Sequence, residues 1–271
     1  MQIVGQKSNL ELINSWSEMP NFIIIKGDRN TGKTTLALAM CEKFNMHYVK
    51  MKNGVNDVRE LIKLMAPNSN TVYHFKDFDK ASIQAKNALL KITEETPVGN
   101  TIIITGSTQI RTLESRARKL VMGAYSLEEM RPYMQKYIQA FDTQQKLYCA
   151  GINTPSKVEK YCKYEQLEQL LNFTYQVFNK ITMLEDMDCI SIMGSFQSKK
   201  EKDEIDTVLL FLSMLIHIIE TNILNKQQYD FYKILNVLIS AKESIEKDYT
   251  LNKKFILFRT FYTLQGMRGS I

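Results

Sequence analysis

The stretch from residue 22 to residue 44, "FIIIKGDRNTGKTTLALAMCEKF", determines the fold. It opens with a short apolar run that is typical of a buried strand, and it closes with a segment that has the composition of a helix. Between them, Gly27 to Thr34 match the pattern G-x-x-x-x-G-K-[ST] without deviation. A strand, a glycine-containing loop and a helix in this order predict a loop that wraps around phosphate groups.

The chemistry of such a loop follows from its backbone. Glycines let the chain approach phosphate oxygens closely, and the amides at the start of the helix point inward. Lys33 would reach the β and γ phosphates, and the Thr34 hydroxyl can ligate magnesium. The sequence therefore predicts a site for ATP made of Gly27, Asp28, Arg29, Asn30, Thr31, Gly32, Lys33, Thr34 and Thr35.

The rest of the first 122 residues alternates short apolar runs with helical periodicity. Strands are expected at 22–26, 47–51, 72–75 and 101–105, and helices at 34–44, 55–64 and 83–94. Strands that alternate with helices predict a parallel sheet covered on both faces.

Beyond residue 122 the pattern changes to helices alone. Ser126 and Glu129 have the spacing of a capping box, and Thr154 before Pro155 predicts another helix start. Residues 194–204 are rich in glycine and charge and are expected to form an exposed loop. Three amphipathic helices should follow, at 205–224, 229–249 and 252–265, of which the first is apolar nearly all round and should be buried on several sides.

Composition and charge limit the function classes. With 44% hydrophobic and 24% charged residues, the 271-residue chain is an ordinary globular protein. A net charge of +6 is compatible with a nucleic-acid partner. Four scattered cysteines and three isolated histidines argue against a zinc site. No apolar run is long enough for a signal peptide or a membrane span, so we expect a soluble, cytoplasmic protein that has no membrane partner.

Several further motifs follow in a fixed order around the phosphate loop. They are "IVGQ" (3–6), "DVRELI" (57–62), "NALLKITEETP" (87–97), "TIIITGS" (101–107) and "ESRARK" (114–119). This order closely resembles the clamp-loader AAA+ ATPases of DNA replication, including bacterial gamma/tau and delta-prime subunits and their phage counterparts. The resemblance covers nearly the whole chain, because "LYCAGINTPSKVEKY" (147–161) is similar to the lid segment of that family.

The resemblance implies an α/β P-loop (AAA+) core at 1–122, a helical lid at 123–165 and an all-α collar at 166–271. It also implies a ring of clamp-loader subunits that opens a sliding clamp and closes it on primer-template DNA. Arg116, which follows Ser115, would be the arginine finger that acts in trans on the ATP of a neighbouring subunit. Such a finger can accelerate hydrolysis by roughly three to five decades.

One departure from the family pattern bears directly on catalysis. Where the family has an Asp that organises the metal and then a catalytic Glu, this sequence has Lys76 and Asp77. A lysine cannot ligand magnesium, although its ammonium could supply positive charge near the phosphates. Asp77 is one methylene shorter than Glu and would position water less well. Each change should cost roughly two to four decades of rate, which predicts weak or absent hydrolysis and makes the Mg²⁺ site at Thr34 and Asp77 doubtful.

Two other positions carry over from the family with changes. A hydroxyl from Thr105 or Ser107 could sense the γ-phosphate, and Lys157 stands where active members carry an arginine. Backbone contacts to DNA are expected near Lys80, Lys86 and Arg111. The short segment between Thr34 and Val72 lacks the zinc module of gamma/tau subunits, which favours a delta-prime-like or phage-type chain.

Two alternatives remain open on the sequence alone. The chain could be a fully active ATPase subunit in which Asp77 or Asp79 takes the metal. It could also be a P-loop protein that binds and regulates the clamp loader of a host.

Overall fold

The computed structural model describes residues 3–107, 111–196, 205–226, 230–248 and 251–267. It forms two compact units, which we describe separately. Unit 1 comprises Met1–Met130 together with Thr154–Ser156, and unit 2 comprises Arg131–Asn153 together with Lys157–Ile271. The finer division into core (1–122), lid (123–165) and collar (166–271) stays a prediction.

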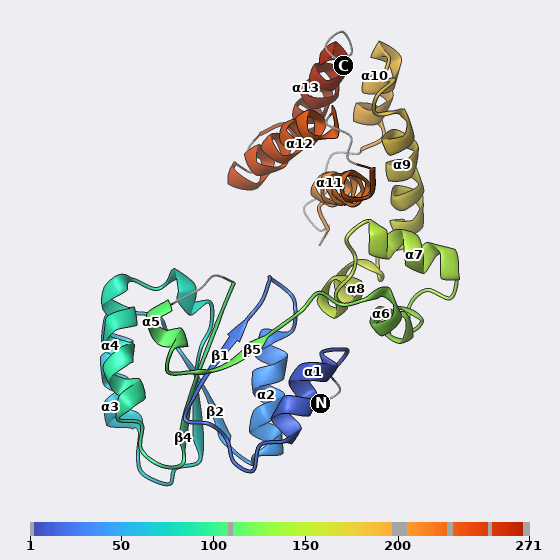
Figure 1. Cartoon of the computed structure of the whole chain (residues 1–271). Coiled ribbons are helices and arrows are strands. Elements are labelled where there is room, and N and C mark those ends of the chain that lie inside the picture. The colour runs from blue at the N-terminus through green and yellow to red at the C-terminus, as the bar shows by residue number, and fades with distance from the viewer. Residues whose placement is uncertain (1–2, 108–110, 197–204, 227–229, 249–250, 268–271) are drawn as a thin grey trace. The chain divides into compact units, whose positions relative to one another are not determined.

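Unit 1 contains a five-stranded sheet in the order β2-β3-β4-β1-β5, and each neighbouring pair is parallel (Figure 1). The strands are β1 (Phe22–Lys26), β2 (His47–Met51), β3 (Thr71–Phe75), β4 (Asn100–Gly106) and β5 (Arg118–Val121). The three central strands are almost wholly buried, as expected of a parallel sheet with both faces covered.

Helices cover both faces of this sheet (Figure 1). α1 (Lys7–Asn14) and α2 (Lys33–Lys43) pack on the face that carries Ile23, Ile25 and Ile103. The opposite face packs against α3 (Val55–Leu64), α4 (Ile83–Glu94) and α5 (Arg111–Glu114). A 3₁₀ turn, η1 (Phe78–Lys80), follows β3. The predicted α/β parallel core is therefore confirmed.

The remaining elements are helices in the part of the chain that the structure describes after β5. They are α6 (Leu127–Met134), α7 (Phe141–Cys149), α8 (Pro155–Tyr161), α9 (Leu167–Lys180), α10 (Asp186–Gly194), α11 (Thr207–Lys226), α12 (Asp230–Lys247) and α13 (Lys253–Gly266). The predicted capping box is present, since the Ser126 amide donates to Glu129 (2.9 Å) and the Glu129 amide donates to the Ser126 hydroxyl (3.2 Å). α8 begins at Pro155, as predicted.

α11 supplies much of the core of unit 2. It packs against α9 and α12, and Phe211, Leu215 and Ile219 have no exposed surface. The prediction that this helix is buried on several sides is confirmed. Most of the predicted loop at 194–204 lies outside the described residues, which end at 196 and resume at 205.

Candidate functional site

The loop at 27–34 lies between β1 and α2, where the sequence places it. Asn30 and Gly32 have positive φ angles of 64° and 85°. A side chain at Gly27 would place its Cβ 2.7 Å from the Cβ of Met122, so only glycine fits there. α2 has no side-chain cap at its N-terminus. Its first amides are therefore open to an anionic ligand, and the loop fits a nucleotide phosphate.

Lys33 lies at the base of this loop and is 9% exposed. Its ammonium donates to the carbonyl oxygens of Gly27 (2.6 Å) and Asp28 (2.5 Å). Burial lowers the pKa of Lys33, and the nearby carboxylates of Asp77, Asp28 and Asp79 partly oppose that shift. The ammonium is therefore within electrostatic reach of the acidic residues that follow β3.

Lys76 and Asp77 follow β3 directly. Lys76 is exposed and is close enough to Lys33 to contribute to the lowering of its pKa. The peptide group between Lys76 and Asp77 is held at both ends, because its carbonyl accepts from Asn53 Nδ2 (2.8 Å) and its amide donates to Thr105 Oγ1 (3.3 Å). Asp77 has a left-handed backbone, with φ 52°. The structure thus places the two unusual residues at the end of β3, within electrostatic range of Lys33.

The residues present favour magnesium less clearly than they favour nucleotide. Thr34 could offer a hydroxyl oxygen and Asp77 a carboxylate. The Asp79 carboxylate accepts bonds from the Ser107 amide (3.1 Å) and hydroxyl (3.0 Å). Among the described residues, no group of three His, Cys, Asp or Glu side chains could hold a metal. Any magnesium here would therefore depend on phosphate oxygens and water for most of its ligands.

Thr105 is 2% exposed, and its hydroxyl lies within a buried polar network. His74 Nε2 lies 3.3 Å from Thr105 Oγ1, and His74 Nδ1 lies 2.7 Å from the Tyr48 hydroxyl. The same Thr105 oxygen accepts the Asp77 amide. Sequence reasoning named Thr105 but missed Tyr48 and His74, although a histidine within an apolar strand was a usable signal.

The N-terminal motif "IVGQ" has a structural role beside the loop. Gln6 Nε2 donates to the Gly123 carbonyl (2.9 Å), and the Gly123 amide donates back to Gln6 Oε1 (3.2 Å). Asn9 supports this pair by donating to Gln6 Oε1 (3.1 Å). Nearby, the buried Tyr125 hydroxyl donates to the Thr31 carbonyl of the phosphate loop (2.9 Å). These contacts, which sequence reasoning did not assign, join the segment after β5 to the nucleotide site.

Arg116 lies between α5 and β5 and is partly exposed. Its Nε donates to Glu94 Oε1 of α4 (2.8 Å), and its Nη1 donates to the Thr112 carbonyl (3.2 Å). Since this pair is exposed, it contributes little to stability. The guanidinium could exchange Glu94 for a phosphate at small cost.

Lys157 belongs to unit 2. Its ammonium donates to the Gly151 carbonyl (2.7 Å). Burial, followed by the charge of Lys242, lowers the pKa of Lys157. Its proposed part in sensing nucleotide stays a prediction.

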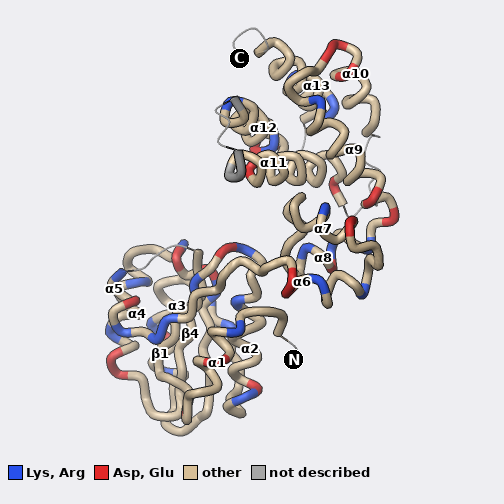
Figure 2. The backbone as a smooth tube through the Cα atoms, turned by 45° about the vertical axis from the view of Figure 1, so that its right-hand side comes forward, with Lys and Arg blue, Asp and Glu red and all other residues tan. Residues whose placement is uncertain are grey.

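The three basic residues that we expected near DNA differ in their surroundings. Lys80 and Arg111 are exposed, whereas the Lys86 ammonium donates to the Asp79 carbonyl (2.6 Å). Both basic and acidic positions occur on unit 1 (Figure 2). The distribution of charge therefore does not by itself mark a nucleic-acid surface.

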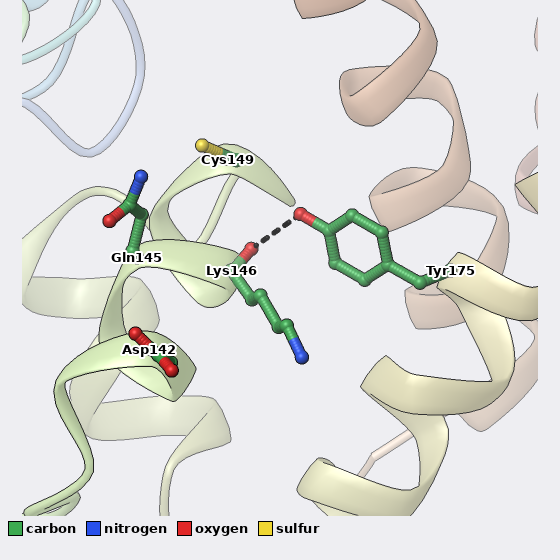
Figure 3. Close-up of a pocket in the computed structure, with 5 residues that line it drawn as sticks. All are labelled: Asp142, Gln145, Lys146, Cys149 and Tyr175. Carbon is green, nitrogen blue, oxygen red and sulfur yellow. Dashed lines mark hydrogen bonds between the residues drawn. The ribbon is translucent and has the colours of Figure 1, made fainter.

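Unit 2 carries a surface hollow of about 280 Å³ between α7 and α9 (Figure 3). It is lined by Asp142, Gln145, Lys146, Cys149 and Tyr175. The Tyr175 hydroxyl donates to the Lys146 carbonyl across it (3.2 Å). None of the predicted site residues lines this hollow.

Comparisons with known proteins support the fold. Neither a protein-family model nor a curated protein sequence matches the chain. A DNA polymerase III gamma-subunit-related protein from Thermotoga maritima is structurally similar over 97% of this chain and 99% of its own, with 16% identity and a TM-score of 0.53. Two RuvB variants from the same organism have TM-scores of 0.52, at 14% and 13% identity, and cover 88% and 92% of this chain and 77% and 86% of their own.

The chain therefore has the fold of the AAA+ P-loop proteins. The gamma-subunit-related structure matches this fold from end to end. In the described residues, no helix is both long and apolar enough to cross a bilayer.

Proposed function

We propose that the chain is an ATP-binding clamp-loader subunit that hydrolyses its own nucleotide weakly or not at all. The observation that carries the proposal is the pair Lys76 and Asp77, which lies within electrostatic range of Lys33 and stands where the resembling family has two acids. Residues 27–35 would hold the triphosphate, with the Lys33 ammonium on its terminal phosphates.

In this proposal, Lys76 replaces part of the charge that magnesium would otherwise supply. Its side chain is exposed and its ammonium acts on Lys33 electrostatically, so it can approach a phosphate in the loop. An ammonium neutralises phosphate charge, but it cannot order water as a hydrated metal does. Tight binding with slow hydrolysis is the expected result.

The chain would act within a ring. Arg116 would leave Glu94 and reach the γ-phosphate held by a neighbouring subunit, while the ring binds a sliding clamp and the backbone of primer-template DNA. Such a subunit serves as scaffold and as finger donor, a role that would place it in the cytoplasm. The end-to-end structural similarity to a DNA polymerase III gamma-subunit-related protein supports this assignment.

A fully active ATPase is the second candidate. Asp77 is only half-buried, and its charge is the strongest of those that raise the pKa of Lys33. In this candidate, the Asp77 carboxylate would serve as the metal ligand or the base.

Titration with a fluorescent ATP analogue, in magnesium and in EDTA, tests the proposal. The wild-type chain should bind with equal affinity in both, and Lys76→Asp should become dependent on magnesium. Lys63→Asp changes the same charge at an exposed position in the last turn of α3 and should behave like the wild type. Lys33→Ala should lose at least about tenfold in affinity, because it removes a charge-assisted contact to phosphate.

Two results would contradict the proposal. If wild-type binding already requires magnesium, a carboxylate holds the ion and the active-ATPase candidate becomes the better one. If Lys33→Ala binds as well as the wild type, the loop is not the nucleotide site.

A further inference from the structure

A line of polar side chains crosses the sheet beneath the phosphate loop. Tyr48 on β2, His74 on β3 and Thr105 on β4 project from the same face, because the parallel register aligns Lys50 with His74 and His74 with Ile103. The apolar side chains of this face pack against α2. The line runs diagonally from the edge strand to the strand beside β1.

Each member of this line depends on the next. His74 has no exposed surface, so both ring nitrogens need partners inside the protein. A neutral imidazole has one N–H and one lone pair, and the hydroxyls of Tyr48 and Thr105 can satisfy both, whichever tautomer is present. With one side of the Thr105 hydroxyl fixed by His74, its oxygen is oriented to accept the Asp77 amide.

The far end of the line meets a backbone that needs support. Asp77 has φ 52°, a left-handed conformation that is uncommon outside glycine and persists where surrounding contacts hold it. Asn53 holds the Lys76 carbonyl from the solvent side, and Thr105 holds the Asp77 amide from the buried side. The plane of this one peptide decides where the side chains of Lys76 and Asp77 point.

We propose that Tyr48, His74 and Thr105 form a brace that fixes the Lys76–Asp77 peptide and so presents these two side chains to the phosphate loop. Tyr48 and His74 are positioning residues, since they act only through Thr105. The inference rests on the proposed function for its effect on nucleotide, but the brace itself is a property of the chain without ligand.

Four forms of the full chain test the brace: wild type, His74→Phe, His74→Gln and Tyr48→Phe. Phenylalanine fills the space and removes both bonds, whereas glutamine can place an amide donor near Thr105. The first readout is hydrogen exchange of the Asp77 amide by NMR, which needs no nucleotide. We expect the Asp77 amide to exchange about tenfold faster in His74→Phe than in the wild type, because this is the typical effect of losing one hydrogen bond. In His74→Gln its exchange rate should stay close to that of the wild type. The amide of Phe75 in β3 is the control and should not change.

The second readout is the ratio of ATP to ADP affinity. His74→Phe should lower that ratio several-fold, Tyr48→Phe should lower it less, and His74→Gln should restore it. If the Asp77 amide exchanges equally in His74→Phe and the wild type, or if glutamine fails as badly as phenylalanine, His74 only fills space and the brace is wrong. Should His74→Phe not fold, Tyr48→Phe decides the matter alone. Tyr48 is half-buried, so the loss of its hydroxyl leaves the ring and its packing in place. A wild-type chain with a protected Asp77 amide that binds no nucleotide would refute the proposed function and leave the brace intact.

Discussion

His74 is buried with its ring nitrogens against the hydroxyls of Tyr48 and Thr105, and this has a consequence for stability. Burial lowers the pKa of His74 from 6.5 to about 4. The positive charges of Lys76 and Lys50 add to this shift, and the negative charge of Asp77 opposes it. Below pH 6.5 the His74 side chain of the unfolded chain binds a proton, whereas that of the folded chain binds it only near pH 4. The free energy of unfolding should therefore fall as the pH drops through this window, by up to about 3 kcal/mol.

Replacement of His74 tests this expectation. His74→Gln lacks the titrating group, so its free energy of unfolding should decrease less than that of the wild type between pH 7 and pH 4.5. Urea unfolding at several pH values measures the difference, and His47→Gln, which changes an exposed histidine, should follow the wild type. Parallel curves for the wild type and His74→Gln would show that the buried ring is protonated as easily as a free one.

The chemistry of single residues was partly readable from the sequence. The phosphate loop could be predicted, because its residues are contiguous and its pattern is specific. The brace could not be predicted, because Tyr48, His74 and Thr105 lie on three strands and only the register of these strands brings them together. No local pattern encodes that register, so each residue looked isolated.

At the scale of elements, Gln6 joins two segments that are far apart in the chain. Gln6→Ala should lower the free energy of unfolding of unit 1 by about 2 kcal/mol, since it removes two hydrogen bonds with Gly123 that are each worth about 1 kcal/mol. Chemical denaturation followed by the fluorescence of Trp16, the only tryptophan, measures the loss. Gln84→Ala removes an exposed glutamine of α4 and is the matched control; an equal loss there would contradict the role of Gln6.

Most elements of unit 1 were predicted within one residue, because apolar runs and helical periodicity agree with the local caps and loops. β5 was missed. Its sequence, Arg118 to Val121, is short and mostly exposed, with only Leu120 buried. β5 is an edge strand that is held by its pairing with β1 and not by an apolar run of its own. Its own residues therefore carry little sequence signal for a strand.

At the scale of the whole molecule, each unit has a core of its own, which predicts separable unfolding. Ile103→Ala in β4 and Leu215→Ala in α11 each open a cavity at a residue without exposed surface and should cost about 2–5 kcal/mol. Trp16 fluorescence reports unit 1, whereas far-UV circular dichroism reports the helices of both units. Ile103→Ala should shift the fluorescence transition, and Leu215→Ala should shift only the dichroism. If both variants move both signals together, the two units unfold as one.

The strand order also has a consequence for synthesis on the ribosome. Among the described strands, β1 pairs with β4 and β5, which are made much later. At ordinary rates of elongation, the apolar run Ile23–Ile25 must wait on the order of ten seconds for its partners. During that interval it is an unpaired β segment of the kind that other chains can capture. The nascent chain is therefore most vulnerable to aggregation before the sheet is complete, and a chaperone that shields β1 would act at the start of translation.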